Sequence, residues 1–78
     1  MNNLEKLTNV FAETFGIDEA QVAGLKYQAI EQWDSVGHMT LIAAIEDAFG
    51  IEMDTDDIID LSSFEKAQEI VAKYRVEL

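Results

Sequence analysis

Cysteine is absent from this 78-residue sequence, and basic residues are scarce. Without cysteine the chain cannot form disulfides or bind zinc through thiolates, so any thiol used in its chemistry must come from another molecule. Five Lys and Arg residues stand against 16 Asp and Glu residues, and the formal net charge is −11. This charge disfavours nucleic acids and anionic membranes, whose phosphates would be repelled, and it favours basic protein surfaces.

Long apolar runs are missing as well. No stretch approaches the ~18 apolar residues that a membrane-spanning helix needs, and the start Met1–Glu5 lacks the basic residues of a secretion signal. We therefore expect a cytoplasmic protein without membrane insertion. At this length we expect a single domain over residues 1–78 and a monomer. Folding buries only ~60% of the surface of so short a chain, which leaves little room for an enclosed active site.

The middle of the chain has no Lys or Arg between Lys26 and Lys66. Acidic residues occupy that interval instead, and we expect them to form an anionic face. They are Glu31, Asp34, Glu46, Asp47, Glu52, Asp54, Asp56, Asp57, Asp60 and Glu65.

Apolar residues at spacings of three and four predict a first helix over about 4–15, capped by Asn2 or Asn3. Its end, Phe15-Gly16-Ile17, fits a left-handed glycine cap in which Ile17 folds back onto Phe11. The same letters return at 49–51 and end a second helix that begins near Ser35. There, Ile51 is expected to fold towards Ile45.

Residues 16–34 show no sustained period and predict a long loop, which is unusual in a compact domain and tends to be functional. Residues 54–61 favour one or two helical turns. A capping box of Ser62 and Glu65 precedes a last amphipathic helix. The predicted fold is therefore all-α, with three longer helices, one short helix and a long loop between the first two.

Asp34 and Ser35 are both common N-cap residues, so an Asp-Ser pair usually does no more than start a helix. The positive end of a helix dipole, with its unpaired amides, also suits a phosphate carried on Ser35. Val36 and Met39 lie on a second apolar stripe of this helix. We expect them to be partly exposed beside Ser35 as a docking surface, unless a loop covers them.

Together, these features resemble an acyl carrier protein over nearly the whole chain. The likeness rests on the Phe-Gly-Ile helix ends, the long loop, Asp34-Ser35 before an apolar residue, the short acidic helix and the last amphipathic helix. The resemblance implies that Ser35 is the attachment point for 4′-phosphopantetheine, added from coenzyme A by a phosphopantetheinyl transferase. It implies a carrier and not an enzyme, whose cofactor thiol holds an acyl or aminoacyl group as a thioester.

The resemblance also implies further partners and site residues. The partners are a loading enzyme and a downstream transferase or synthase with basic docking surfaces. Residues similar to the family's acidic recognition surface are Asp34, Glu46, Asp47, Asp56, Asp57 and Asp60, and each of these except Asp34, which adjoins Ser35, could instead be ordinary solvated surface. An acyl pocket by analogy, or otherwise a filled core, would be lined by Leu41, Ile45, Met53, Leu61, Ala67 and Ile70.

Gly37, His38 and Thr40 stand where fatty-acid carriers usually have more acids, which favours a specialised carrier. Gly37 either leaves room for the arm or for a partner's backbone, or is simply tolerated in a first turn. His38 is expected at the edge of the core or on the surface. A further hypothesis places it, when charged, beside the cofactor phosphate, giving partner binding a pH dependence.

A calcium-binding loop starting at Asp54 fails, because Ile59 stands where glycine is required, and we expect no metal site. A cofactor-free helical module that binds a partner through Val36 and Met39 remains an alternative on sequence alone.

Overall fold

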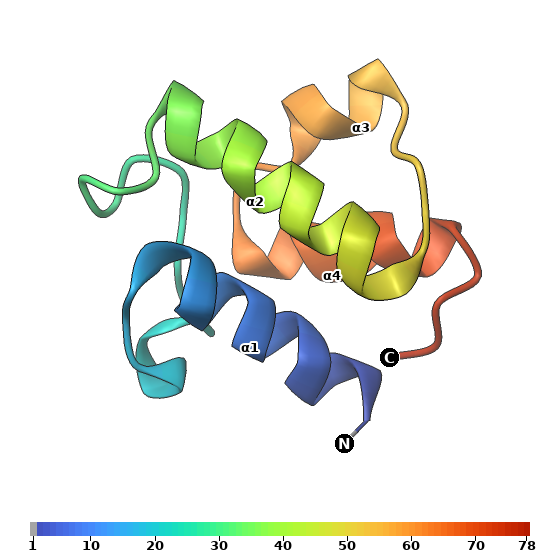
Figure 1. Ribbon diagram of the computed structural model, residues 1–78, viewed down its shortest axis with the longest axis horizontal. Helices are drawn as coiled ribbons and strands as arrows, with labels where there is room; N and C mark the ends of the chain where they lie inside the picture. Colours follow the sequence, from blue (N-terminus) through green and yellow to red (C-terminus); the bar gives the residue numbers. More distant parts are fainter. Residues whose placement is uncertain (1) are drawn as a thin grey trace.

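The computed structural model describes residues 2–78 and contains four α-helices joined by short and long connections (Figure 1). The helices are α1 (Asn3–Phe15), α2 (Ser35–Phe49), α3 (Thr55–Asp60) and α4 (Phe64–Lys73), and a single 3₁₀ turn, η1 (Glu19–Gln21), lies between α1 and α2. The prediction of an all-α fold with three longer helices and one short helix is confirmed.

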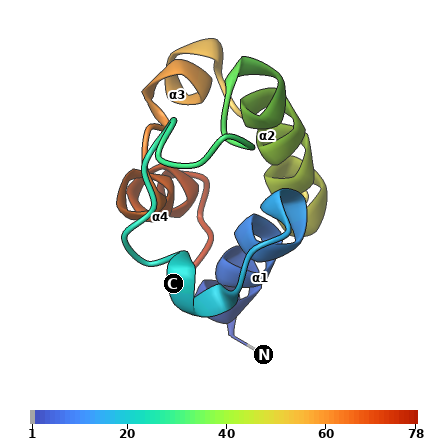
Figure 2. The same ribbon diagram turned by 90° about the vertical axis from the view of Figure 1, so that its left-hand side faces the viewer.

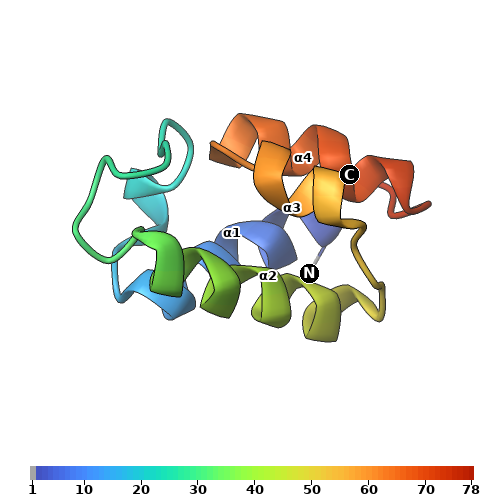
Figure 3. The ribbon, with the colours of Figure 1, turned by 90° about the horizontal axis from the view of Figure 1, so that it is seen from above.

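The helices form one small bundle. Figure 2 shows α1 at one end of the bundle and α3 at the other, with α2 and α4 between them. The start of α2 and the long loop lie at the same end of the molecule in Figures 1 and 3. The C-terminus and the first described residues lie away from that end in the same views.

Both Phe-Gly-Ile helix ends have the predicted geometry. Gly16 and Gly50 have left-handed backbones with φ of 66° and 65°. The amide of Ile17 donates to the carbonyl of Ala12 at 3.0 Å, and that of Ile51 donates to the carbonyl of Glu46 at 3.1 Å. Both isoleucines pack against the core, so the two caps also turn the chain inwards.

Helix starts follow the sequence with one exception. Asn2 caps α1 by accepting the Glu5 amide at 2.8 Å. The predicted cap of the last helix is wrong by one residue, because Ser63, not Ser62, accepts the Lys66 amide, at 2.9 Å. Strand-like pairing with the long loop explains the shift. The Ser62 carbonyl accepts the Tyr27 amide and the Phe64 amide donates to the Leu25 carbonyl, so the chain stays extended until residue 63.

The core is dense in aromatic rings. Trp33 is fully buried, stacks on Phe15 and meets the ring of Phe11 edge to face at 5.6 Å between centroids. Phe64 meets Phe11 in the same way at 5.0 Å. Because Trp33 belongs to the loop and Phe64 to α4, these rings fix the end of the loop to the bundle just before α2 begins.

Candidate functional site

Ser35 occupies the first turn of α2 and is exposed. Asp34 precedes it as the N-cap, with its Oδ1 accepting the Gly37 amide at 2.8 Å. A hydroxyl at this place is open to a partner enzyme and stands at the positive end of a 15-residue helix. The site could therefore hold a phosphate group.

Gly37 leaves space for the protein's own backbone. A Cβ at this position would lie 1.8 Å from the carbonyl oxygen of Gln32. The Gln32 side chain in turn donates from Nε2 to the Phe15 carbonyl at 3.2 Å, which anchors the loop to the end of α1. The glycine thus allows the loop to cross close over the first turn of α2, an explanation that neither sequence hypothesis for Gly37 contained.

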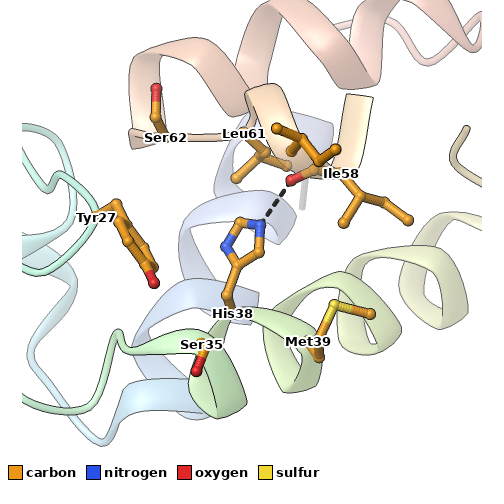
Figure 4. A pocket seen from close by; sticks show the side chains of 8 residues that line it. Tyr27, Ser35, His38, Met39, Ile58, Leu61 and Ser62 are labelled. Carbon is orange, nitrogen blue, oxygen red and sulfur yellow. Dashed lines mark hydrogen bonds between the residues drawn. The ribbon is translucent and has the colours of Figure 1, made fainter. Parts of the chain in front are cut away.

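His38 is half-buried and faces the protein with both ring nitrogens. Its Nδ1 lies 2.9 Å from Nε1 of Trp33, and its Nε2 lies 2.7 Å from the carbonyl oxygen of Ile58 in α3 (Figure 4). The indole N–H can only donate, so Nδ1 accepts and Nε2 carries the proton. The ring lies at the edge of the core, as expected, and its two nitrogens are occupied by Trp33 and Ile58.

A pocket of about 370 Å³ opens beside Ser35 between α2, α3 and the long loop (Figure 4). Its volume lies at the small end of the range for ligand sites, roughly 300–1,000 Å³. The surface is mostly apolar and contains no Asp, Glu, Lys or Arg. It is lined by Tyr27, Ser35, His38, Met39, Ile58, Ile59, Leu61 and Ser62.

Of the residues expected to line an acyl pocket or otherwise to fill the core, only Leu61 lines the pocket beside Ser35. The remaining predicted residues are buried in the filled core, since the layer between α2 and α4 is already occupied by side chains. They are Leu41, Ile45, Met53, Ala67 and Ile70. Sequence analysis missed Tyr27, Ile58 and Ser62 because nothing local shows that the loop and α3 meet over the start of α2.

Three large apolar side chains stand out on the surface near this pocket. Val36 is 75% exposed, Met39 54% and Ile59 75%. The prediction that Val36 and Met39 are exposed is confirmed. Ile59 could have been suspected, because Ile58 and Ile59 are adjacent on a short helix and cannot both face the core. We call Val36, Met39 and Ile59 the apolar surface.

The predicted acidic recognition surface is smaller than expected. Asp57 is buried at 6% exposure, where Lys73 donates to its Oδ1 at 2.6 Å and the Tyr74 hydroxyl donates to its Oδ2. Asp57 as an exposed recognition residue is therefore wrong, since it joins α3 to the end of α4. Glu46 is half-buried, and its Oε2 accepts the Met53 amide at 2.8 Å. The recognition acids that remain exposed are Asp34, Asp47, Asp56 and Asp60.

The Asp57 contacts shift the pKa values of all three groups. The hydrogen bonds from Lys73 and then Tyr74 hold the Asp57 pKa below its usual range, because they favour the carboxylate. The same bonds raise the pKa values of Lys73 and Tyr74, since each loses its proton less readily beside the anion.

Residues 2–78 contain neither a metal-binding cluster nor a membrane-spanning helix. No cluster of three or more His, Asp or Glu side chains placed to hold a metal ion was found. No helix in this range has the length and apolar character needed to cross a membrane.

A comparison with protein families identifies the family and the cofactor that its members carry. Residues 5–67 match the family described as "Phosphopantetheine attachment site". The chain belongs to this family. Its members carry a 4′-phosphopantetheine group and are carriers, not catalysts, and they interact with transferases and biosynthetic enzymes. Membership decides against the cofactor-free interaction module.

The site is compatible with this cofactor on two observations. An exposed serine hydroxyl offers an attachment point at a helix start, and the pocket beside it gives an attached arm somewhere to lie. The family match covers α1 from its third residue, all of α2 and α3, and the start of α4, so it includes every residue that lines the pocket.

Proposed function

We propose that this protein is an acyl carrier in which Ser35 holds 4′-phosphopantetheine, whose thiol carries an acyl group as a thioester. The observation that carries the proposal is the apolar pocket beside an exposed serine at the start of α2. The absence of cysteine agrees with it, because the cofactor supplies the thiol that the chain lacks.

Ser35 is the best placed of the three serines within the matched residues. Ser63 is half-buried, and its hydroxyl caps α4. Ser62 is exposed, but it sits in an extended segment whose carbonyl pairs with the long loop. Ser35 alone of the three combines exposure with the start of a long helix.

The pocket favours an acyl cargo over an aminoacyl one. A free amino group on the cargo would be positively charged, and a buried charge needs an ionic or hydrogen-bonding partner. No carboxylate lines the pocket, whereas its isoleucine, leucine and methionine side chains suit a hydrocarbon chain. The small volume favours a short or medium chain.

The attachment is tested by intact mass after incubation with coenzyme A and a broad-specificity phosphopantetheinyl transferase. The wild type should gain one phosphopantetheine, Ser35→Ala should gain none, and Ser62→Ala, the matched control at the same pocket, should be modified like the wild type. Modification of the Ser35→Ala variant, or its loss only in Ser62→Ala, would refute the assignment.

The cargo is tested by loading matched groups through the corresponding coenzyme A thioesters. Hexanoyl and octanoyl forms should melt at a higher temperature than the form with a free thiol, because the pocket covers their apolar surface. An alanyl form should show no such rise. An equal or greater rise for the alanyl form would favour an aminoacyl carrier.

The partners in this proposal are the phosphopantetheinyl transferase, an enzyme that loads the acyl group, and a downstream transferase or synthase. The apolar surface, with Asp47, Asp56 and Asp60, would meet them. Because coenzyme A thioesters are made inside cells, a cytoplasmic location fits this role.

A further inference from the structure

The His38 side chain connects the three parts of the chain that surround the pocket, namely the long loop, α2 and α3. Trp33 at the end of the loop donates to Nδ1 of His38 on α2, and Nε2 of the same ring donates to the Ile58 carbonyl on α3. Ser35 lies between Trp33 and His38 in the sequence, within the segment that this ring holds. His38 and Ile58 both line the pocket, so their hydrogen bond joins α2 to α3 at the pocket wall.

The tryptophan end of this connection is fixed. Trp33 is fully buried, stacks on Phe15 and lies nearly parallel to the His38 ring, at 13° and 6.2 Å between centroids. The α3 end is less secure, because α3 has six residues and its Ile59 is largely exposed. A helix of this length is marginal by itself and depends on tertiary contacts.

We propose that His38 is a latch that holds α3 over the pocket, and that uptake of a second proton by its ring releases the latch. In the doubly protonated ring both nitrogens are donors, so Nδ1 would turn its hydrogen towards the Trp33 N–H. Because Nε2 still donates when the ring is doubly protonated, the bond that must break is the one from Trp33, and the ring must move away from the fixed indole and displace α3 with it. Imidazoles as a class change charge between pH 5 and 8, and the latch is therefore tested across that range.

No carboxylate around the His38 ring is placed to pair with the positive charge of its doubly protonated form. Tyr27 from the loop faces it at 5.7 Å between ring centroids, and phenols ionise only well above this pH range. On α2, the Asp34 carboxylate is engaged by the Gly37 amide, and on α3 Asp57 is engaged by Lys73 and Tyr74. Asp56 and Asp60 are the exposed acids of α3, and no hydrogen bond or ion pair between residues 2–78 joins either to His38.

The latch is tested first on the protein without cofactor, so that the outcome does not depend on the proposed cargo. Trp33 is the sole tryptophan and is bonded to the ring in question, so its fluorescence reports the latch directly. Between pH 8 and 5 we expect a one-proton transition in Trp33 emission. Amide exchange of Ile58 and Leu61, corrected for intrinsic rates, should become roughly five- to thirtyfold faster as one hydrogen bond is lost.

The variant His38→Gln separates titration from structure. Glutamine offers a donor and an acceptor but takes up no proton in this range, so its emission and its α3 exchange should not depend on pH between 5 and 8. Circular dichroism should be constant over the same range for both proteins, which excludes general unfolding. A wild type without the transition, or the same transition in His38→Gln, would overturn the latch.

If His38→Gln fails to fold, Tyr27→Phe takes its place. An unchanged transition in Tyr27→Phe supports His38 as the source of the transition, and loss of the transition in Tyr27→Phe overturns the latch.

The effect of the latch on the bound acyl group rests on the proposed function, and it is measured separately. The rise in melting temperature on octanoyl loading should be smaller at pH 5.5 than at pH 8 in the wild type, and equal at both in His38→Gln. Equal rises at the two pH values in the wild type would overturn the link between latch and cargo. No rise at either pH would instead refute the acyl pocket, leaving the fluorescence result to judge the latch.

Discussion

Gly37 shows how one residue sets the geometry next to the candidate attachment serine. Its missing Cβ lets the carbonyl of Gln32 lie against the first turn of α2, and this crossing brings the loop down just ahead of Ser35. Sequence alone could identify the glycine as unusual for a helix. It could not identify the carbonyl, because the contact depends on the path of the whole loop.

Replacing Gly37 with alanine should destabilise the protein. On helix propensity the change would gain about 1 kcal/mol. The steric conflict with the Gln32 carbonyl should outweigh this gain, since overpacking costs about 1–3 kcal/mol, and the free energy of unfolding in urea should fall. Gly24→Ala is the control, because a Cβ there meets nothing within 4 Å. A Gly37→Ala protein more stable than the wild type would contradict the close crossing.

Asp34 has two roles that a pair of substitutions can separate. As the N-cap it accepts the Gly37 amide, and Asp34→Ala should lower stability by about 1 kcal/mol. Asp34→Asn keeps a capping oxygen but removes the charge, so its stability should be close to that of the wild type. If the charge aids recognition, Asp34→Asn should still be modified more slowly by the transferase. An unchanged kcat/KM in Asp34→Asn would leave Asp34 with the capping role only.

At the scale of helices, α3 is held to α4 by a buried carboxylate. Asp57 receives hydrogen bonds from Lys73 and Tyr74, and the Asp54 amide donates to the same Tyr74 hydroxyl at 2.9 Å. The sequence shows these residues but does not predict that they bond to one another. An acidic run at a helix start gives no sign of which acid turns towards the core. Helix ends were predicted well for the opposite reason, since caps depend on neighbours within a few residues.

This network predicts how stability depends on pH. The Asp57 pKa is lowered in the folded protein, so its stabilisation is complete above the usual carboxyl value of ~3.9 and is lost as pH falls through the lower folded value. The pKa values of Lys73 and Tyr74 are raised, so their contribution is present below about pH 10 and is lost as pH rises further.

The measurement is the urea midpoint as a function of pH. Asp57→Asn should be less stable than the wild type at pH 7 and should lose less on acidification to pH 3. Asp60→Asn, an exposed position on the same helix, should follow the wild-type curve. If both variants behave alike, the buried network contributes nothing specific.

For the molecule as a whole, the strong negative charge predicted an acidic docking face, and the structure alters that expectation around Ser35. Two of the expected acids, Glu46 and Asp57, are half-buried or buried and hydrogen-bonded within the protein, whereas Val36, Met39 and Ile59 are exposed. Charge therefore remains suited to attracting a basic partner from a distance, while close contact near Ser35 is apolar. The net charge could be counted from the sequence. Which acids are exposed and which are buried could be known only from the fold.

A charge placed on the apolar surface should test this division. Val36→Asp should lower kcat/KM of the transferase by about tenfold or more, because the carboxylate would have to be desolvated in the contact. Stability should be preserved, since Val36 is exposed in the first turn of α2, where an acid is favourable. Ala20→Asp, which adds the same charge at an exposed position in η1, is the control. Equal effects of the two changes would indicate a response to net charge only.

The placement of the chain ends has a practical consequence. The C-terminus lies away from the start of α2, where the long loop delivers the candidate attachment serine. A copy of this protein immobilised on a bead or sensor chip through a C-terminal tag would therefore turn Ser35 towards the flowing solution. Such a surface could be loaded, washed and presented to one enzyme after another, with each product retained on the support.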